Sequence, residues 1–356
     1  MIAPGDGAHI VPSEARPRSE VGASLPEQNA LVWEGGDVVA VRLVPLPQTR
    51  SGWVPVDVSY AGICGSDLHI AAGEHGRAQP GIVLGHEFVG RLSEPYQDLA
   101  AGQPVFVNPL VHCGDCEACL AGHTNVCRNM TLVGIDYPGG IASRVVAPGY
   151  GIYPLPIDVD LVAAALIEPV AVAVRAVRRS GLAIGHRAHV VGAGPVGCLV
   201  GLLAAAAGAA VTLSELSPVR RRYATDLGLT IVDGPDELSA GADVVFDASG
   251  HTSVAPTLLR WLRAAGTAVI VGAYQPGLHS VDLLEVMFAE ITILGTRTYQ
   301  RSDVEAAVDL VTTGRLDARR LISAIYPLDE AASALESLRR GEGMKVLIEP
   351  GQARVA

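Results

Sequence analysis

The sequence predicts an α/β protein with a doubly wound parallel sheet and a second, β-rich domain. Strand-like and helix-like segments alternate through the second half of the chain, which is typical of a parallel sheet with helices on both faces. The first half consists of short strand-like runs separated by glycine and proline, which indicates a small β-rich domain. At 356 residues, of which 49% are hydrophobic, the chain can form two such domains.

The first half begins with a segment, residues 1–28, that is rich in proline, glycine, serine and glutamate and shows no periodicity. We predict that it is a loose N-terminal extension, ordered in part by packing. Strand-like runs follow at 30–33, 38–44 and 54–60, and a helical pattern covers 163–179.

The second half alternates regularly between the two kinds of element. The predicted order is a strand at 188–191, a helix to about 207, a strand at 210–214, a helix at 218–227, and strands at 244–247, 268–272, 291–295 and 346–349. We therefore expect a β-rich domain over 29–180 and 319–356, and the doubly wound domain over 181–318.

Charge and hydropathy exclude some partners. The net charge of −11 repels phosphate backbones, so no nucleic acid is expected to bind. The N-terminus lacks a secretion signal, which favours a cytoplasmic protein. Residues 190–213 contain no charge and are long enough to span a membrane, but their glycines and proline favour a strand, a turn and a helix. No membrane partner is expected.

Four of the six cysteines form a compact motif. They are Cys113, Cys116, Cys119 and Cys127, with gaps of two, two and seven residues. Closely spaced thiolates on a turning loop suit a tetrahedral structural zinc site. The alternatives are disulfides or free thiols, and disulfides are disfavoured without an export signal.

Three separate segments carry further potential metal ligands. They are the Cys-Gly-Ser-Asp-Leu-His run at 64–69, the Gly-His-Glu run at 85–87, and Glu168-Pro169. A catalytic zinc needs about three protein ligands and an open position. Cys64, His86 and one carboxylate could supply them.

A glycine motif indicates a dinucleotide site. Gly192, Gly194 and Gly197 follow a strand-like run and open a helical one, so that a pyrophosphate could approach the helix N-terminus. Glu215 ends the next predicted strand, where an acid hydrogen-bonds a ribose 2′-hydroxyl and repels a 2′-phosphate. This favours NAD over NADP. The arginines at 220–222 either form a solvated helix face or could meet such a phosphate.

Taken in this order, the cysteine run, the Gly-His-Glu run, the four-cysteine loop, Glu-Pro and the glycine motif resemble the medium-chain zinc dehydrogenase family. The resemblance runs from about Asn29 to near the end of the chain. Within this family, the Glu168-Pro169 pair makes the chain resemble the branch of sorbitol, butanediol and threonine dehydrogenases.

The family resemblance implies a Rossmann coenzyme domain and a GroES-like catalytic domain. It also implies one catalytic and one structural zinc ion, NAD as the cofactor, and a homo-oligomer, expected to be a tetramer.

The resemblance also implies roles for the catalytic residues. Cys64 and His86 would bind the catalytic zinc, and either Glu87 or Glu168 would be the third ligand, with the other contacting the zinc-bound water. Asp67 would fix the tautomer of the histidine ligand.

The same resemblance implies a proton relay and a cofactor site. Ser66 and His69 would pass the proton of the alcohol to solvent. The residues expected at the cofactor are Gly192, Gly194, Pro195, Val196, Gly197, Glu215, Arg220, Val271, Ala273 and Arg297.

The sequence therefore predicts a zinc-dependent oxidoreductase that transfers hydride between a secondary alcohol, such as a polyol or vicinal diol, and NAD. Its expected partner is a small alcohol or ketone. The alternatives are a threonine-type amino-alcohol dehydrogenase and a catalytically inactive cofactor-binding protein.

Overall fold

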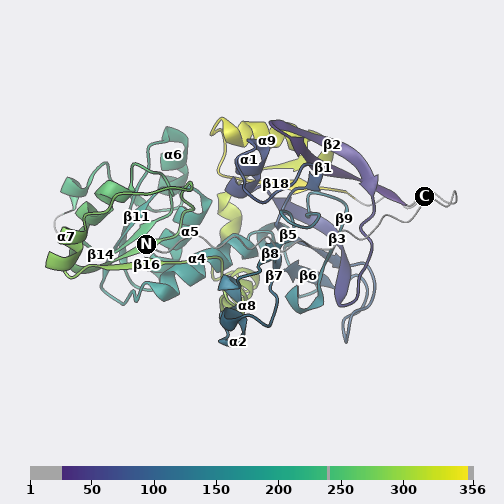
Figure 1. Ribbon diagram of the computed structural model, residues 1–356, viewed down its shortest axis with the longest axis horizontal. Helices are drawn as coiled ribbons and strands as arrows, with labels where there is room; N and C mark the ends of the chain where they lie inside the picture. The colour runs from purple at the N-terminus through teal and green to yellow at the C-terminus, as the bar shows by residue number, and fades with distance from the viewer. Residues whose placement is uncertain (1–25, 239–240, 352–356) are drawn as a thin grey trace, which may run out of the picture.

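Two sheets lie side by side along the long axis of the molecule, with helix α4 (Ile167–Arg179) between them (Figure 1). The computed structural model describes residues 26–238 and 241–351. Residues 1–25, which make up most of the predicted extension, lie outside the described residues. The last two residues of the predicted extension, Glu27 and Gln28, already pair with Pro45 and Val44 at the start of the first strand.

The first half of the chain forms antiparallel sheets. Its strands are β1 (Glu27–Gly35), β2 (Val38–Pro45), β3 (Trp53–Gly62), β4 (Ile82–Val83), β5 (Glu87–Leu92), β6 (Pro104–Val107), β7 (Leu110–Val111), β8 (Thr131–Leu132), β9 (Arg144–Pro148) and β10 (Ile152–Pro154). Two strands from the end of the chain, β17 (Ile322–Pro327) and β18 (Lys345–Glu349), join β3 in a 7-stranded sheet. The C-terminal strand thus lies beside the start of the candidate site.

The second half forms a 6-stranded parallel sheet. Its strands are β11 (Arg187–Val191), β12 (Ala210–Ser214), β13 (Thr230–Ile231), β14 (Ala242–Asp247), β15 (Leu262–Ile270) and β16 (Thr292–Gly295). They lie in the order β13-β12-β11-β14-β15-β16, which is the doubly wound order of dinucleotide-binding folds. The strand order reverses between β11 and β14, where such folds bind their ligands. This confirms the predicted fold class.

Helices cover the sheets and connect them. Besides α4 they are α1 (Gly65–Ala71), α2 (Glu117–Leu120), α3 (Leu161–Ala164), α5 (Pro195–Ala206), α6 (Pro218–Asp226), α7 (Leu283–Phe288), α8 (Arg301–Thr312) and α9 (Ala331–Arg339). The apolar stretch at 190–213 forms β11, α5 and β12, as predicted. No helix in the described ranges combines the length and apolarity that crossing a membrane requires.

The predicted helix at 163–179 is divided into α3 and α4. Pro169 has no N–H and could not continue the hydrogen bonding of a helix that began at 163. The break before Ile167 places Pro169 in the first turn of α4, where no N–H is needed. One apolar cluster then runs from Val89 and Phe106 through Val170 of α4 to Leu199 of α5. Glu168 is therefore fixed at the junction of the two sheets.

Candidate metal and cofactor sites

The first candidate site joins the end of β3 to the start of β5. Cys64 is the N-cap of α1, and His86 and Glu87 lie at the beginning of β5. One ligand atom from each of these residues lies within 4.8 Å of the others. The structure therefore brings together two segments that the sequence separates by more than 20 residues.

Asp67 connects these two segments. Its buried carboxylate accepts hydrogen bonds from the N–H of Cys64 at 2.8 Å and from that of Gly85 at 3.2 Å. Its Oδ1 lies 3.9 Å from Nδ1 of His86, which is too long for a hydrogen bond. Asp67 thus fixes the backbone of both segments.

Glu87 is paired with a lysine that the sequence interpretation missed. Nζ of Lys345, in β18, donates to Oε2 of Glu87 and, at 3.0 Å, to the carbonyl of Ile63. Both side chains are only 2% exposed. Burial raises the pKa of Glu87, but the charge of Lys345 outweighs burial and lowers it below the usual value.

Glu168 lies outside the cluster of Cys64, His86 and Glu87 but close to it. Burial, followed by the negative charge of Glu87, raises the pKa of Glu168 to about 7. Tyr299, only 1% exposed, is a near neighbour: burial and then the negative charge of Glu168 raise the pKa of this tyrosine.

The electrostatics of this site fit a divalent cation. Burial lowers the pKa of His86, but the negative charges of Cys64, Asp67 and Glu168 outweigh burial and raise it well above its usual value. Buried acidic groups thus outnumber the single buried lysine, Lys345. An excess of buried negative charge is costly unless a cation compensates for it, and a thiolate, an imidazole and a carboxylate form a ligand set that zinc accepts.

The two predicted relay residues lie on α1. Ser66 is half-buried, with its Oγ 4.0 Å from Sγ of Cys64. His69, three residues further on, is exposed and lies 3.0 Å from Oε2 of Glu74. Residues at this spacing share a helix face, so the two side chains lead from the cluster towards solvent.

The four-cysteine motif folds into a second candidate metal site. Sγ of Cys127 is 3.4 Å from that of Cys113 and 3.9 Å from that of Cys116, and Cys113 lies 4.0 Å from Cys119. Four thiolates at zinc–sulfur distances of about 2.3 Å in a tetrahedron are about 3.8 Å apart. No cysteine of the described residues forms a disulfide. The spacing therefore fits one tetrahedral ion.

The glycine motif forms a tight turn between β11 and α5. Gly192 has φ +95°, and a Cβ on Gly197 would lie 1.9 Å from the carbonyl oxygen of Gly192. Gly194 is the N-cap of α5, Pro195 is the first residue of the helix, and Val196 follows it; no side chain caps the helix. The first N–H groups of α5 remain available for an anion.

Glu215 holds this turn from the end of β12. Its Oε2 accepts the N–H of Ala193 at 2.9 Å, and its Oε1 accepts those of Leu216 and Ser217. Of the three neighbouring arginines, Arg221 pairs with Asp233 at 2.6 Å, whereas Arg220 extends towards Gly194.

Three further residues expected at the cofactor lie on loops. Val271 and Ala273 follow β15, and the carbonyl of Ala273 lies against Gly250 at the end of β14. Arg297 follows β16; its side chain is exposed, and its carbonyl accepts a hydrogen bond from Asn125.

Comparisons with known proteins agree with this architecture. Residues 50–157 match the alcohol dehydrogenase GroES-like domain, and residues 195–313 match the zinc-binding dehydrogenase domain. The chain is 36% identical to 2-dehydro-3-deoxy-L-galactonate 5-dehydrogenase of Pseudoalteromonas atlantica, over 84% of this chain and 92% of the relative. This chain belongs to the medium-chain zinc-dependent alcohol and polyol dehydrogenase family.

Other proteins similar to this dehydrogenase include two that are named after a sugar acid and a diol. L-galactonate-5-dehydrogenase of Escherichia coli is 34% identical over 86% of this chain and 91% of its own length. Among solved structures, 2R,3R-butanediol dehydrogenase of Bacillus subtilis has a TM-score of 0.82 and 28% identity, over 91% of this chain and 100% of its own. A Sinorhizobium meliloti protein described as a zinc-binding dehydrogenase and bound to NADP has a TM-score of 0.86 and 32% identity, over 91% and 99%.

These findings confirm the predicted family, the GroES-like and Rossmann-like domains, and a zinc-dependent alcohol oxidoreductase that uses a nicotinamide cofactor.

Proposed function

We propose that the chain transfers hydride between a secondary hydroxyl of a polyol or sugar acid and NAD, at a zinc ion held by Cys64, His86 and Glu87. The observation that carries this proposal is the convergence of these three ligands within 4.8 Å, while Glu168 lies outside the group. The names of the relatives support the substrate class, because they include two sugar-acid dehydrogenases and a butanediol dehydrogenase.

The residues of the chain then have distinct tasks. Zinc in this site would make a substrate hydroxyl more acidic. Ser66, beside Cys64, would accept the hydroxyl proton as it gives up its own, and exposed His69 would deliver a proton to solvent. Asp67 keeps the ligand segments together through its two backbone hydrogen bonds.

We assign NAD rather than NADP as the preferred cofactor. Glu215 places a carboxylate beside the glycine turn, where it would repel a 2′-phosphate. Arg221 is already paired with Asp233, so Arg220 alone of these two could meet such a phosphate. The NADP-bound structure from S. meliloti makes this preference worth measuring directly.

We further propose a second, structural zinc ion in the four-cysteine site and assembly into a homo-oligomer. The large apolar side chains of Leu278, Leu283, Leu284, Met287, Phe288 and Ile293 are exposed. They lie in or next to α7 and the edge strand β16, and α7 has no buried residue. We call this surface the α7–β16 face; an apolar surface of this kind suits a second copy of the chain.

The test combines metal analysis with a substrate panel. We expect about two zinc ions per chain, and cofactor reduction with L-galactonate, xylitol or (2R,3R)-butanediol but not with L-threonine. NAD should bind more tightly than NADP. Turnover of L-threonine alone, or of none of these alcohols, would count against the proposed substrate class.

A matched pair of cysteine variants tests the ligand assignment. Cys64→Ser should abolish turnover and remove one zinc ion, whereas Cys198→Ser, in the buried core of α5, should keep both. A Cys64→Ser enzyme with normal turnover would refute the assignment.

A further inference from the structure

The segment that leads from β16 to α8 contains a strained residue. Thr298 has a φ of +44°, in the left-handed region that β-branched residues avoid. Such a conformation costs about 1–3 kcal/mol and persists only where the surroundings impose it. The neighbours of Thr298 must therefore hold it.

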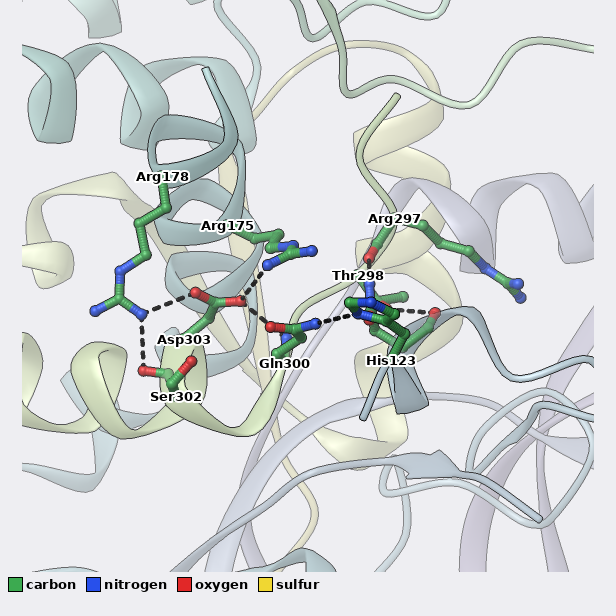
Figure 2. A network of polar contacts seen from close by, with 9 residues as sticks. His123, Arg175, Arg178, Arg297, Thr298, Gln300, Ser302 and Asp303 are labelled. Carbon is green, nitrogen blue, oxygen red and sulfur yellow. Dashed lines mark hydrogen bonds and ion pairs between the residues drawn. The ribbon is translucent and has the colours of Figure 1, made fainter. Parts of the chain in front are cut away.

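One set of neighbours belongs to the cysteine lobe, residues 113–127, which carries the four-cysteine site. Nδ2 of Asn125 donates to the carbonyl of Arg297 at 3.0 Å, and Oγ1 of Thr298 donates to the carbonyl of Asn125 at 3.5 Å. Nε2 of Gln300 and Nδ1 of His123 are 3.2 Å apart (Figure 2). Asn125, only 3% exposed, precedes the fourth cysteine by two residues.

The other neighbours fix the end of the segment to α4. Gln300 is the N-cap of α8, and its N–H donates to Asp303 at 2.9 Å. The other oxygen of Asp303, a residue 1% exposed, accepts a hydrogen bond from Arg178 of α4 at 2.9 Å (Figure 2). Segment 297–300 is thus held between the cysteine lobe and the helix that carries Glu168.

Tyr299 belongs to this restrained segment, and its side chain lies towards the proposed catalytic site. Its buried side chain belongs to the same apolar cluster as Leu166 and Ile167, the two residues that precede Glu168 in the sequence. Among the described residues, its hydroxyl has no well-formed hydrogen bond. A displacement of 297–300 would therefore move the tyrosine beside Glu168.

We infer that the cysteine lobe positions the catalytic centre: Asn125 holds Thr298 in its strained conformation and thereby keeps Tyr299 against Glu168. Asn125 and Thr298 are positioning residues, because neither belongs to the cluster of Cys64, His86 and Glu87. The inference rests on the proposed function, since Glu168 matters for turnover only if that cluster is the catalytic centre.

The first test is Asn125→Ala in the full-length, zinc-loaded protein. Amide hydrogen exchange of peptides covering 296–300 should become about tenfold faster, because the segment opens more easily. With the most active alcohol of the substrate panel, kcat should fall about 2- to 30-fold, the usual range for coupling through a packed network. KM for the cofactor should change less than kcat, because Arg297 is the one expected cofactor residue in this segment and the phosphates are expected at the glycine turn.

Gln28→Ala is the matched control. Gln28 is also a buried amide, and it donates to the carbonyl of Arg144 at 2.9 Å, far along the chain from this segment. Its loss should lower the melting temperature without changing exchange at 296–300 or kcat. If the wild type is active but Asn125→Ala, like Gln28→Ala, changes neither exchange at 296–300 nor kcat, the inference is overturned. An inactive wild type would instead contradict the proposed function.

Thr298→Gly tests the role of strain. Glycine adopts a positive φ without penalty, so the segment should need less restraint. The effect of Asn125→Ala on kcat should then be at least threefold smaller in the Thr298→Gly background, as a double-mutant cycle measures. Equal effects in both backgrounds would contradict the inference.

Discussion

Lys345 is the only lysine in a chain with 26 basic residues; the others are arginines. It opens an apolar C-terminal strand, and its stem packs against Gly62, where a Cβ would come within 3.0 Å of Cε. The space thus admits an amine but leaves little room for a guanidinium. The presence of a single lysine in an arginine-rich chain was the sequence signal that could have pointed to the buried ion pair with Glu87.

Lys345→Met should destabilise the protein strongly. Removing one partner of a buried ion pair leaves the other charge uncompensated and typically costs about 3–5 kcal/mol. We expect the free energy of unfolding of the metal-free protein, measured with urea, to fall by that order.

The added change Glu87→Gln provides the control for this prediction. It removes the buried charge that Lys345→Met leaves behind, so the double variant should recover much of the loss. No recovery would mean that the lysine stabilises the fold by packing alone.

Glu168 should make the stability of the metal-free protein depend on pH. Its pKa is about 7 in the fold, against an ordinary value of 4.5. The folded chain therefore keeps this proton to higher pH than the unfolded chain, and the free energy of unfolding falls as pH rises from about 4.5 to about 7. Glu168→Gln should remove this loss and stabilise the metal-free protein by about 1–3 kcal/mol at pH 8, but not at pH 4.

Chemical denaturation at the two pH values measures this difference. The exposed Glu330→Gln serves as the control and should show no such dependence. A Glu168→Gln protein with the same gain at pH 4 and pH 8 would show that the carboxylate charge is not the cause.

At the scale of elements, each strand and helix that the sequence predicted overlaps an observed one, because hydrophobic periodicity and glycine positions are local signals. The short strands β4 to β10, the strands β13 and β17, and the helices α1, α2 and α7 to α9 were not predicted. The sequence correctly predicted β11, α5 and β12 from the glycine motif and its flanks. It missed Tyr299 and Lys345 as partners of Glu168 and Glu87, because such pairs depend on contacts between distant segments; Lys345 and Glu87 are 258 residues apart.

The glycine turn should tolerate a methyl group at one position and not at another. Gly197→Ala places a Cβ 1.9 Å from a backbone oxygen, so the turn must open, and we expect both thermal stability and cofactor affinity to fall. Gly194→Ala meets nothing nearer than 3.9 Å and should leave the stability of the free protein nearly unchanged.

Thermal unfolding and titration with NADH separate these two variants. If Gly194→Ala keeps its stability but binds NADH at least tenfold more weakly, the turn approaches the cofactor as proposed. Unchanged NADH affinity in both variants would place the cofactor elsewhere.

At the scale of the whole molecule, α4 joins the two sheets, and α7 lies at the outer end of the parallel one (Figure 1). The family resemblance led us to expect an oligomer, but the sequence alone could not locate the contact. Exposed apolar residues become a recognisable surface only once the fold places them together.

Phe288→Asp should dissociate the proposed oligomer. The substitution places a charge in the α7–β16 face, whose burial without a partner is strongly unfavourable. Sedimentation velocity should show the main species shift to a lower mass. Ile184 is also an exposed apolar residue, but it lies against Gly208 just after the end of α5, so Ile184→Asp should leave the mass unchanged.

Because the chain has a single lysine, proteolysis after lysine can measure local unfolding at one defined bond. A protease that cleaves only after lysine has one target bond in the whole chain, between Lys345 and Val346, inside a buried strand that pairs with both β17 and β3. Cleavage there requires β18 to detach from β17 and β3, so the digestion rate measures how often this strand opens beside the proposed catalytic site. Amine-reactive dyes and cross-linkers, for the same reason, should react only slowly with the buried Lys345 of the native protein.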